Sequence, residues 1–219
     1  MNRKSYQQFC GLACALDVLG ERWTLLVVRE LMFGPRRFVD LLDAMPGIGS
    51  NTLTTRLRAL EEDGLIVRGT LPPPVTSAVY RLTPAGQALE PVIVELGRWG
   101  MSRFSDVDAE ATFRPEWLLF GLKLAIGDDT ADLPDCACQF LVDGSPILLR
   151  VRQGRVEVTQ SSAENPDVTL QMDTATIKEI GLGGLSPLEA VGAGRISVAG
   201  RLELVGPLLE RMGATLARA

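Results

Sequence analysis

The sequence predicts an α+β protein of two domains, a helix-rich N-terminal domain that ends in a β-hairpin and a smaller α/β domain of sheet and helices. Residues 1–105 show helical periodicity in successive segments before two short strands, whereas residues 137–172 alternate strand-like runs with Asp-Gly and Gln-Gly turns. Charge divides similarly, with 12 Lys and Arg against 10 Asp and Glu over residues 1–105 (+2), and 10 against 17 over residues 106–219 (−7). The acidic total therefore does not argue against a nucleic-acid partner for the first half.

Length and composition exclude several classes of protein. The 219 residues suit two domains. We find neither a run of roughly 18 uncharged apolar residues nor a hydrophobic run after the first four residues, so we expect no membrane span, no signal peptide and a cytoplasmic location. Histidine is absent, which removes His-dependent catalysis and His-containing zinc sites. With no phosphate loop, dinucleotide fingerprint or convincing carboxylate pair, we expect no enzyme, no cofactor and no metal site, and four cysteines that stay thiols.

Three helical segments are expected at the start of the first domain. Leu16, Val18 and Leu19 belong to a short helix that Gly20 closes. Residues 22–34 form a second helix, whose nearly continuous apolar residues predict a central position. Residues 36–45 form a third, after the stop signal of a Gly-Pro pair.

The stretch GIGSNTLTTRLRALEEDGL, residues 47–65, predicts a fourth helix with two different faces. Ser50 is the expected N-terminal cap and Gly64 the expected end. Leu53, Leu57 and Leu60 form the buried stripe. At about 100° per residue, the polar side chains opposite or beside that stripe are Asn51, Thr52, Thr54, Thr55 and Arg58, with Arg56 nearer the core edge. Such an outward face is typical of a recognition helix, although an ordinary amphipathic surface helix has the same pattern.

Two strands, residues 65–70 and 78–83, are predicted to form a hairpin whose tip holds Pro72, Pro73 and Pro74. Helix–turn–helix plus a hairpin is a winged helix. A long helix over residues 83–104, capped at Thr83, follows and should span about 30 Å. Its apolar face predicts a two-fold dimer, which would match palindromic DNA; that face consists of Leu89, Val92, Ile93, Leu96 and Trp99.

The segments ALDVLGERWTLLVVRELMFGPRRFVDLL, MPGIGSNTLTTRLRALEEDGLI and YRLTPAGQAL, in this order, resemble the HxlR-type winged-helix transcriptional regulators, relatives of the MarR type. The resemblance covers about residues 9–104 and implies a homodimeric protein that binds double-stranded DNA. It also implies that Arg36 and Arg37 lie near the DNA backbone, and that Cys10 is a candidate redox sensor. The alternative interpretation is that Cys10 is a small apolar helix residue, like Cys14 one turn later.

The resulting DNA-binding prediction combines the helix face, the two arginines before the third helix and the two arginines flanking a wing tip that lacks basic residues. The predicted set is Arg36, Arg37, Ser50, Asn51, Thr52, Thr54, Thr55, Arg56, Arg58, Arg68 and Arg81.

The second half begins after a polar, acidic segment. We expect domains at residues 1–104 and 113–219 with a linker at 105–112. An apolar helix (116–127), three strands within 137–161, a strand (165–172), helices at 173–183 and 185–194, a strand (195–200) and a closing helix (201–212) follow. With the segments NPDVTLQMDTAT and LSPLEAVGAGRISVAG, this order resembles the sterol-carrier-protein-like domain.

That resemblance implies an apolar tunnel for a lipid or another hydrophobic molecule. The candidate lining residues are Trp117, Phe120, Leu124, Phe140, Ile177, Ile180, Leu182 and Leu208. The same side chains are interpretable as plain core, because a domain of this size buries most of its large apolar residues. Cys136 and Cys138 could form half a metal site, but without histidine no full ligand set is expected.

The sequence therefore predicts a cytoplasmic, homodimeric transcription regulator that reads DNA with the helix at residues 50–63 and responds to a hydrophobic effector in its second domain. Neither the operator nor the sign of regulation follows from the sequence. The alternative is a carrier of lipid or another hydrophobic ligand, in which the winged helix serves only dimerisation.

Overall fold

The computed structural model describes residues 5–71, 76–108, 110–127 and 133–218 of the chain. The chain forms two compact units, residues 1–93 and 94–219, of which the second is the longer. The units divide inside a helix, upstream of the predicted linker 105–112, so the predicted domain limits stay predictions. In the described ranges, no helix combines the length and the apolar character needed to cross a membrane.

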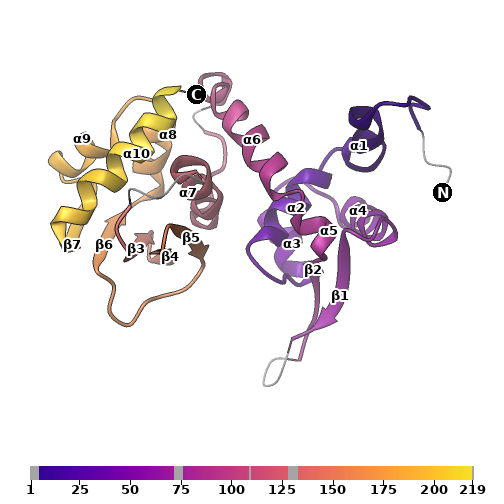
Figure 1. The fold of residues 1–219 in the computed structure, drawn as a ribbon, viewed down its shortest axis with the longest axis horizontal. Helices are drawn as coiled ribbons and strands as arrows, with labels where there is room; N and C mark the ends of the chain where they lie inside the picture. The colour runs from indigo at the N-terminus through magenta and orange to yellow at the C-terminus, as the bar shows by residue number, and fades with distance from the viewer. Residues whose placement is uncertain (1–4, 72–75, 109, 128–132, 219) are drawn as a thin grey trace. The chain divides into compact units, whose positions relative to one another are not determined.

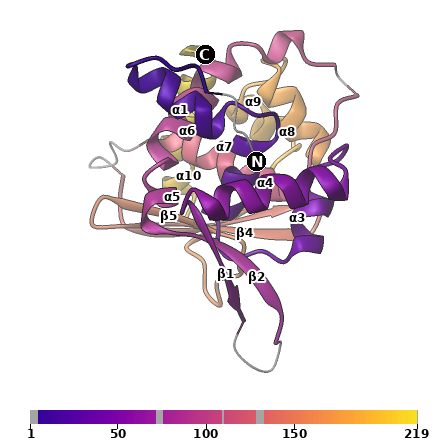
Figure 2. The same ribbon diagram turned by 90° about the vertical axis from the view of Figure 1, so that its right-hand side faces the viewer.

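The first unit packs short helices against a two-stranded antiparallel hairpin (Figures 1 and 2). Its elements are α1 (Gly11–Leu19), α2 (Thr24–Met32), α3 (Phe38–Ala44), α4 (Ser50–Glu62), β1 (Ile66–Thr70), β2 (Ala78–Leu82) and α5 (Pro84–Gln87), and α6 (Glu90–Met101) leads into the second unit. Figure 2 shows the hairpin reaching away from the helices. The predicted tip prolines, residues 72–74, lie outside the described residues.

The helix α2 is central to the first unit, as its continuous apolar sequence predicts. Val27 and Val28 are fully buried, and α2 contacts α3, α4 and β2. Leu41 of α3 and the leucine stripe of α4 complete this core. Burial of such side chains contributes about 1.5–3 kcal/mol each, so apolar spacing rather than helix propensity holds these short helices in place.

The start of α4 differs from the prediction and its end agrees with it. Gly49, in an extended conformation, precedes the first helical residue, and no side chain caps the helix, so the prediction of Ser50 as the cap is wrong. The helix begins one residue earlier because the amide of Leu53 already donates to the Gly49 carbonyl at 3.0 Å. At the other end Gly64 adopts φ +68°, and the Leu65 amide donates to the Leu60 carbonyl at 2.9 Å, which is a Schellman closure.

The predicted long helix over residues 83–104 is broken. Thr83 caps α5 as expected, since its hydroxyl accepts from the Gly86 amide at 3.2 Å. The helical path is interrupted at Ala88 and resumes as α6. Pro91 explains the interruption, because proline lacks the amide that a continuous helix would need there and its ring clashes with the preceding turn.

The second unit is a mixed five-stranded sheet in the order β5-β4-β3-β6-β7, in which β3 and β6 are parallel and the other neighbours antiparallel. Figure 1 shows α7, α8, α9 and α10 grouped on one side of this sheet. The strands are β3 (Cys136–Val142), β4 (Ser145–Arg152), β5 (Arg155–Thr159), β6 (Val168–Met172) and β7 (Ser197–Gly200). The helices are η1 (Phe104–Asp106), η2 (Pro115–Trp117), α7 (Leu118–Ile126), α8 (Thr174–Gly181), α9 (Pro187–Gly192), η3 (Leu202–Leu204) and α10 (Val205–Arg218).

Both predicted turns of the second unit are present. Asp143 and Gly144 (φ +47° and +81°), like Gln153 and Gly154 (φ +50° and +68°), have the paired positive φ of tight hairpin turns. The predicted closing helix, residues 201–212, instead begins as the 3-10 turn η3 and continues as α10 to Arg218. One sheet face carries fully buried residues such as Phe140, and this face forms the core of the unit.

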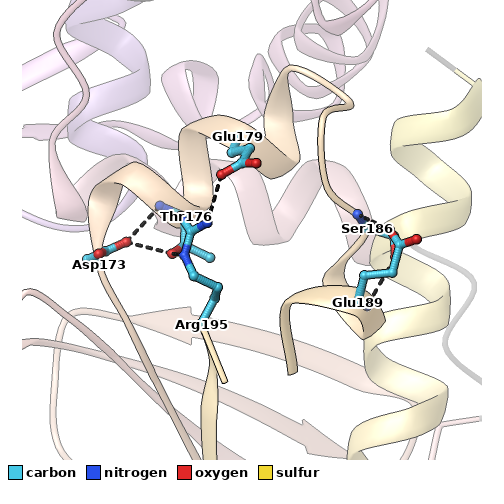
Figure 3. Close-up of polar contacts among 6 residues, drawn as sticks. All are labelled: Asp173, Thr176, Glu179, Ser186, Glu189 and Arg195. Atoms are coloured by element: carbon cyan, nitrogen blue, oxygen red, sulfur yellow. Dashed lines mark hydrogen bonds and ion pairs between the residues drawn. The ribbon is translucent and has the colours of Figure 1, made fainter. Parts of the chain in front are cut away.

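Polar contacts fix the connections around α8 and α9 (Figure 3). Asp173 caps α8 by accepting from the Thr176 hydroxyl at 2.6 Å and from the Thr176 amide at 2.7 Å, and these hydrogen bonds lower the pKa of Asp173. Arg195 donates to the Thr176 hydroxyl at 3.2 Å and pairs with Glu179 at 2.9 Å, which ties the approach to β7 to α8. A reciprocal capping box between Ser186 and Glu189 starts α9.

Candidate nucleic-acid interface

The outward face of α4 is polar and exposed above its fully buried leucine stripe. Ser50, Asn51 and Thr52 are exposed at the start of the helix, and Arg58 is exposed two turns later. Among the described residues, Arg58 forms no ion pair or hydrogen bond. This helix therefore presents an amide and an unpaired guanidinium to an incoming ligand from a rigid scaffold.

Two of the three threonines of the face already form hydrogen bonds with their own helix. The Thr54 hydroxyl donates to the Ser50 carbonyl at 2.9 Å, and the Thr55 hydroxyl donates to the Asn51 carbonyl at 2.9 Å. Each hydroxyl has thereby used its single hydrogen and retains only acceptor capacity toward a ligand.

Arg56 lies in a different environment from Arg58. Its guanidinium is 3.4 Å from the Glu21 carboxylate, and its side chain is largely buried. The prediction that Arg56 contacts DNA stays a prediction. The low exposure of its side chain argues against it, because a largely buried guanidinium would have to leave Glu21 to reach a phosphate. No local sequence pattern relates Arg56 to Glu21, because the two residues lie 35 positions apart in the chain.

Arg36 and Arg37 precede α3 and are held differently. The backbone of Arg36 exchanges hydrogen bonds with Tyr80 of β2, at 3.0 and 2.8 Å. Arg37 pairs with Asp40 at 2.8 Å, and this hydrogen-bonded guanidinium lowers the pKa of the Asp40 carboxyl. Arg36 and Arg37 therefore sit at the junction of α3 with the wing, where the fold fixes their backbone.

The wing arginines point to opposite faces of the hairpin. The register pairs Arg68 with Tyr80 and Arg81 with Val67, and side chains of adjacent strand residues alternate. Arg68 lies over the Tyr80 ring at 5.5 Å and pairs with Glu61 of α4 at 3.2 Å. Arg68 and Arg81 therefore cannot both contact one flat DNA surface in the same way. Strand alternation alone predicts this difference, and the sequence-based set of DNA-contacting residues did not take it into account.

The helices α1 and α6 expose apolar stripes. On α6, Val92, Leu96 and Trp99 follow helical spacing and are 57%, 48% and 67% exposed. The predicted stripe divides here, because Ile93 is buried. In α1 Leu12 and Leu16 are exposed one turn apart. Contiguous exposed apolar patches are a feature of protein interaction surfaces, so these two stripes are candidates for such a surface.

The predicted ligand-lining residues of the second unit differ in burial. Phe140, Leu124, Ile180 and Leu208 are buried in the core, and Leu182 is exposed. Trp117, Phe120 and Ile177 are half-buried. Three pockets formed by described residues, of about 310, 430 and 500 Å³, are lined mainly by polar and charged side chains and include none of the eight. The lining set stays a prediction.

Cys10 and Cys14 are both exposed thiols one turn apart at the start of α1. The basic residues Arg3 and Lys4, which precede Cys10 in the sequence, lie outside the described residues. The sensor role of Cys10 therefore stays a prediction.

A polar recognition face on the fourth helix, a central buried α2 and a following hairpin define the class of winged helix-turn-helix transcriptional regulators. Comparison with known proteins makes the assignment narrower. Residues 18–108 match the family described as HxlR-like helix-turn-helix, and residues 132–208 match the SCP-2 sterol transfer family. The chain belongs to the HxlR-like family of transcriptional regulators, as the sequence resemblance predicted.

Several regulators are similar to the first part of the chain. The uncharacterised HTH-type transcriptional regulator sll1512 of Synechocystis is 41% identical over 91 residues, which are 42% of this chain and 67% of that protein. The HTH-type transcriptional regulator YodB of Bacillus subtilis is 36% identical over 85 residues, which are 39% of this chain and 76% of that protein. The solved reduced form of YodB has 32% identity and a TM-score of 0.40, covering 46% of this chain and all of that one.

Proposed function

We propose that the protein is a homodimeric regulator that binds double-stranded DNA through α4. The side chains proposed to face base edges are those of Asn51, Thr52, Thr55 and Arg58. The observation that supports this proposal is the exposed Arg58, which forms no ion pair or hydrogen bond with another described residue. It lies on the outward face of α4, whose opposite face is buried in the core. Arg36 and Arg37 at the wing junction supply phosphate contacts, which position the protein while base contacts specify the sequence. The HxlR-like family membership supports this assignment.

The dimer is proposed from the surfaces of α1 and α6. A three-residue apolar stripe on α6 and a two-residue stripe on α1 are the surfaces that a second copy would cover. A two-fold dimer would present two copies of α4 to half-sites about one helical turn of DNA apart. Palindromic target sites are therefore expected.

The test starts from selection of duplexes out of a random-sequence library by the full-length protein. Binding of the parent, Arg58→Ala and a control, Arg152→Ala, is then measured on the selected duplex and on single-base variants of it. Arg152 is an exposed arginine of the second unit, so its loss removes the same charge away from α4. Arg58→Ala should cost about 1–3 kcal/mol on the selected duplex and relax preference at one base position.

Two results would redirect the proposal. An equal loss on every duplex would make Arg58 a phosphate contact. Binding that changes little as salt rises would contradict an interface that neutralises several phosphates, and would favour the alternative of a hydrophobic-ligand carrier whose winged helix serves dimerisation.

We further propose that the second unit binds a hydrophobic effector whose differential affinity for two dimer states shifts DNA affinity. The match of residues 132–208 to the SCP-2 sterol transfer family supports this role. Native mass spectrometry of the purified protein, followed by organic extraction, tests it. A retained hydrophobic molecule near one per chain supports the effector, and an empty protein assigns the second unit a structural role.

A further inference from the structure

Two cysteines of the second unit face each other on one strand. Cys136 and Cys138 are two residues apart on β3, so their side chains lie on the same face of the sheet, and their sulfur atoms are 3.6 Å apart. Cys138 is buried opposite Leu149 of β4, whereas Cys136 is half-buried at the start of the strand. The pair lies in the regular part of the sheet, because β4 is paired with both residues.

A disulfide between them does not fit this strand. Same-face neighbours on a strand are separated by about 6.6 Å along the chain, whereas a disulfide brings the two Cβ atoms to about 3.5–4.5 Å. β4 pairs on one side with both cysteines, and β6 pairs on the other with Cys138 at Val168. Closing the bond would therefore disrupt ladder hydrogen bonds on both sides of β3.

A shared metal ion requires almost no movement of the strand. With metal–sulfur bonds of about 2.3 Å and tetrahedral angles, two thiolates on one zinc-like ion are about 3.8 Å apart. The observed separation of 3.6 Å is within a few tenths of an ångström of that value. The separation of the two sulfur atoms would therefore change by only a few tenths of an ångström on binding such an ion.

The pair is reachable from solvent. Cys136 lines a pocket of about 500 Å³ together with Arg150, Arg152, Asp135 and Asp167. The two carboxylates are engaged elsewhere: Asp135 accepts from the Gln153 amide at 2.7 Å and Asp167 from the Ala137 amide at 2.8 Å. Cys136 lines this pocket and Cys138 does not, so an ion would meet the Cys136 sulfur first.

We propose that Cys136 and Cys138 form a two-thiolate chelating site for a thiophilic divalent ion of the zinc and cadmium class. Each ion bound displaces the two thiol protons, and water completes its coordination. Within the described ranges no group of three or more His, Cys, Asp or Glu residues is arranged to hold a metal. Because both protein ligands are thiolates, the site prefers soft, thiol-seeking ions over hard, oxygen-seeking ions such as Mg²⁺.

The test uses the full-length, reduced protein in a Cys10→Ser/Cys14→Ser background, which removes the exposed thiol pair of α1. Titration with Cd²⁺ is followed by the ultraviolet absorption of cadmium–thiolate bonds. We expect one ion per chain, a release of protons that grows as the solution is made more acidic within the folded range, and a higher Tm with Cd²⁺. In that background, Cys136→Ala should weaken Cd²⁺ binding by more than about 100-fold. Loss of a residue that only hydrogen-bonds a metal ligand costs about 10- to 100-fold, so the larger loss is expected of a direct ligand.

Two outcomes would overturn the site. One is the absence of the thiolate absorption while circular dichroism shows a folded protein. The other is cadmium binding that Cys136→Ala leaves unchanged. Cys136 lies half-exposed at the strand start, so its alanine variant is expected to fold; Cys138→Ala, which keeps a small apolar residue in the core, provides the second variant.

Discussion

Gly86 lies at a contact where a single added carbon has a calculable consequence. A Cβ atom at this position would lie 2.1 Å from the carbonyl oxygen of Leu65 and 3.1 Å from a methyl group of Leu82. That carbonyl cannot turn away freely, because it accepts from the Thr83 amide at 3.0 Å and from the Thr83 hydroxyl at 3.2 Å. Gly86→Ala must therefore move α5 or break the connection between the end of α4 and β2.

Two opposing effects set the magnitude. Replacing a helical glycine by alanine ordinarily stabilises a protein by about 0.5–1 kcal/mol. Overpacking a rigid contact costs about 1–3 kcal/mol, and here the obstacle is backbone rather than a flexible side chain. We expect a net loss of roughly 1–2 kcal/mol, or a Tm lower by about 2–8 °C for a chain of this size.

The matched control is Gly11→Ala. Gly11 is the first residue of α1, and a Cβ atom there meets nothing within 4 Å. Thermal unfolding of both variants, followed by circular dichroism at 222 nm, compares the same chemical change in a crowded and in an open position. A Gly86→Ala protein as stable as Gly11→Ala would refute the reasoning from the 2.1 Å contact.

Two further predictions concern surfaces of the first unit and of α6. Leu96→Glu places a charge in the exposed stripe of α6 and should shift the protein from dimer to monomer in analytical ultracentrifugation, whereas the control Arg152→Glu should not. If the Leu96→Glu variant keeps the mass of the parent protein at low concentration, α6 is not part of the dimer interface. Asp40→Asn should lower Tm at pH 7, because Arg37 lowers the pKa of Asp40 in the folded state and the ionised carboxylate is therefore stabilising above the unfolded pKa of about 3.9. That difference should disappear as pH falls through the folded-state pKa of Asp40, and a Tm difference that persists at about pH 2, below the ordinary carboxyl range, would show that Asp40 acts through packing.

The apolar spacing of the sequence was sufficient to predict most elements of both units. The buried stripe of α4 at Leu53, Leu57 and Leu60 and the Asp-Gly turn at Gly144 are local patterns, and the structure has both. The errors arose where two local signals compete. Ser50 is a good capping residue, but Gly49 takes the cap position and Ser50 is the first helical residue. The apolar pattern of residues 83–104 predicts one helix, but Pro91 divides it into α5 and α6.

The candidate site was less predictable because partners come from distant segments. The ion pair of Arg56 with Glu21 and the contact of Arg68 with Tyr80 join residues that no local pattern relates. The direction of wing side chains was predictable from strand alternation alone. An apolar sequence pattern cannot distinguish a filled core from the wall of a tunnel. Phe140, which is fully buried, fits both.

The hydrogen bonds that the Thr54 and Thr55 hydroxyls donate to the backbone of α4 restrict which bases these side chains can contact. With both hydrogens committed to the helix backbone, these side chains can only receive hydrogen bonds, as from the exocyclic amino groups of cytosine or adenine in the major groove, or pack their methyl groups against thymine. Thr54 and Thr55 therefore cannot donate to the two acceptors of guanine, whereas the Arg58 guanidinium can contact both of them. We expect the operator to place a guanine opposite Arg58, and to place adenine, cytosine or thymine as the base that faces Thr54 or Thr55.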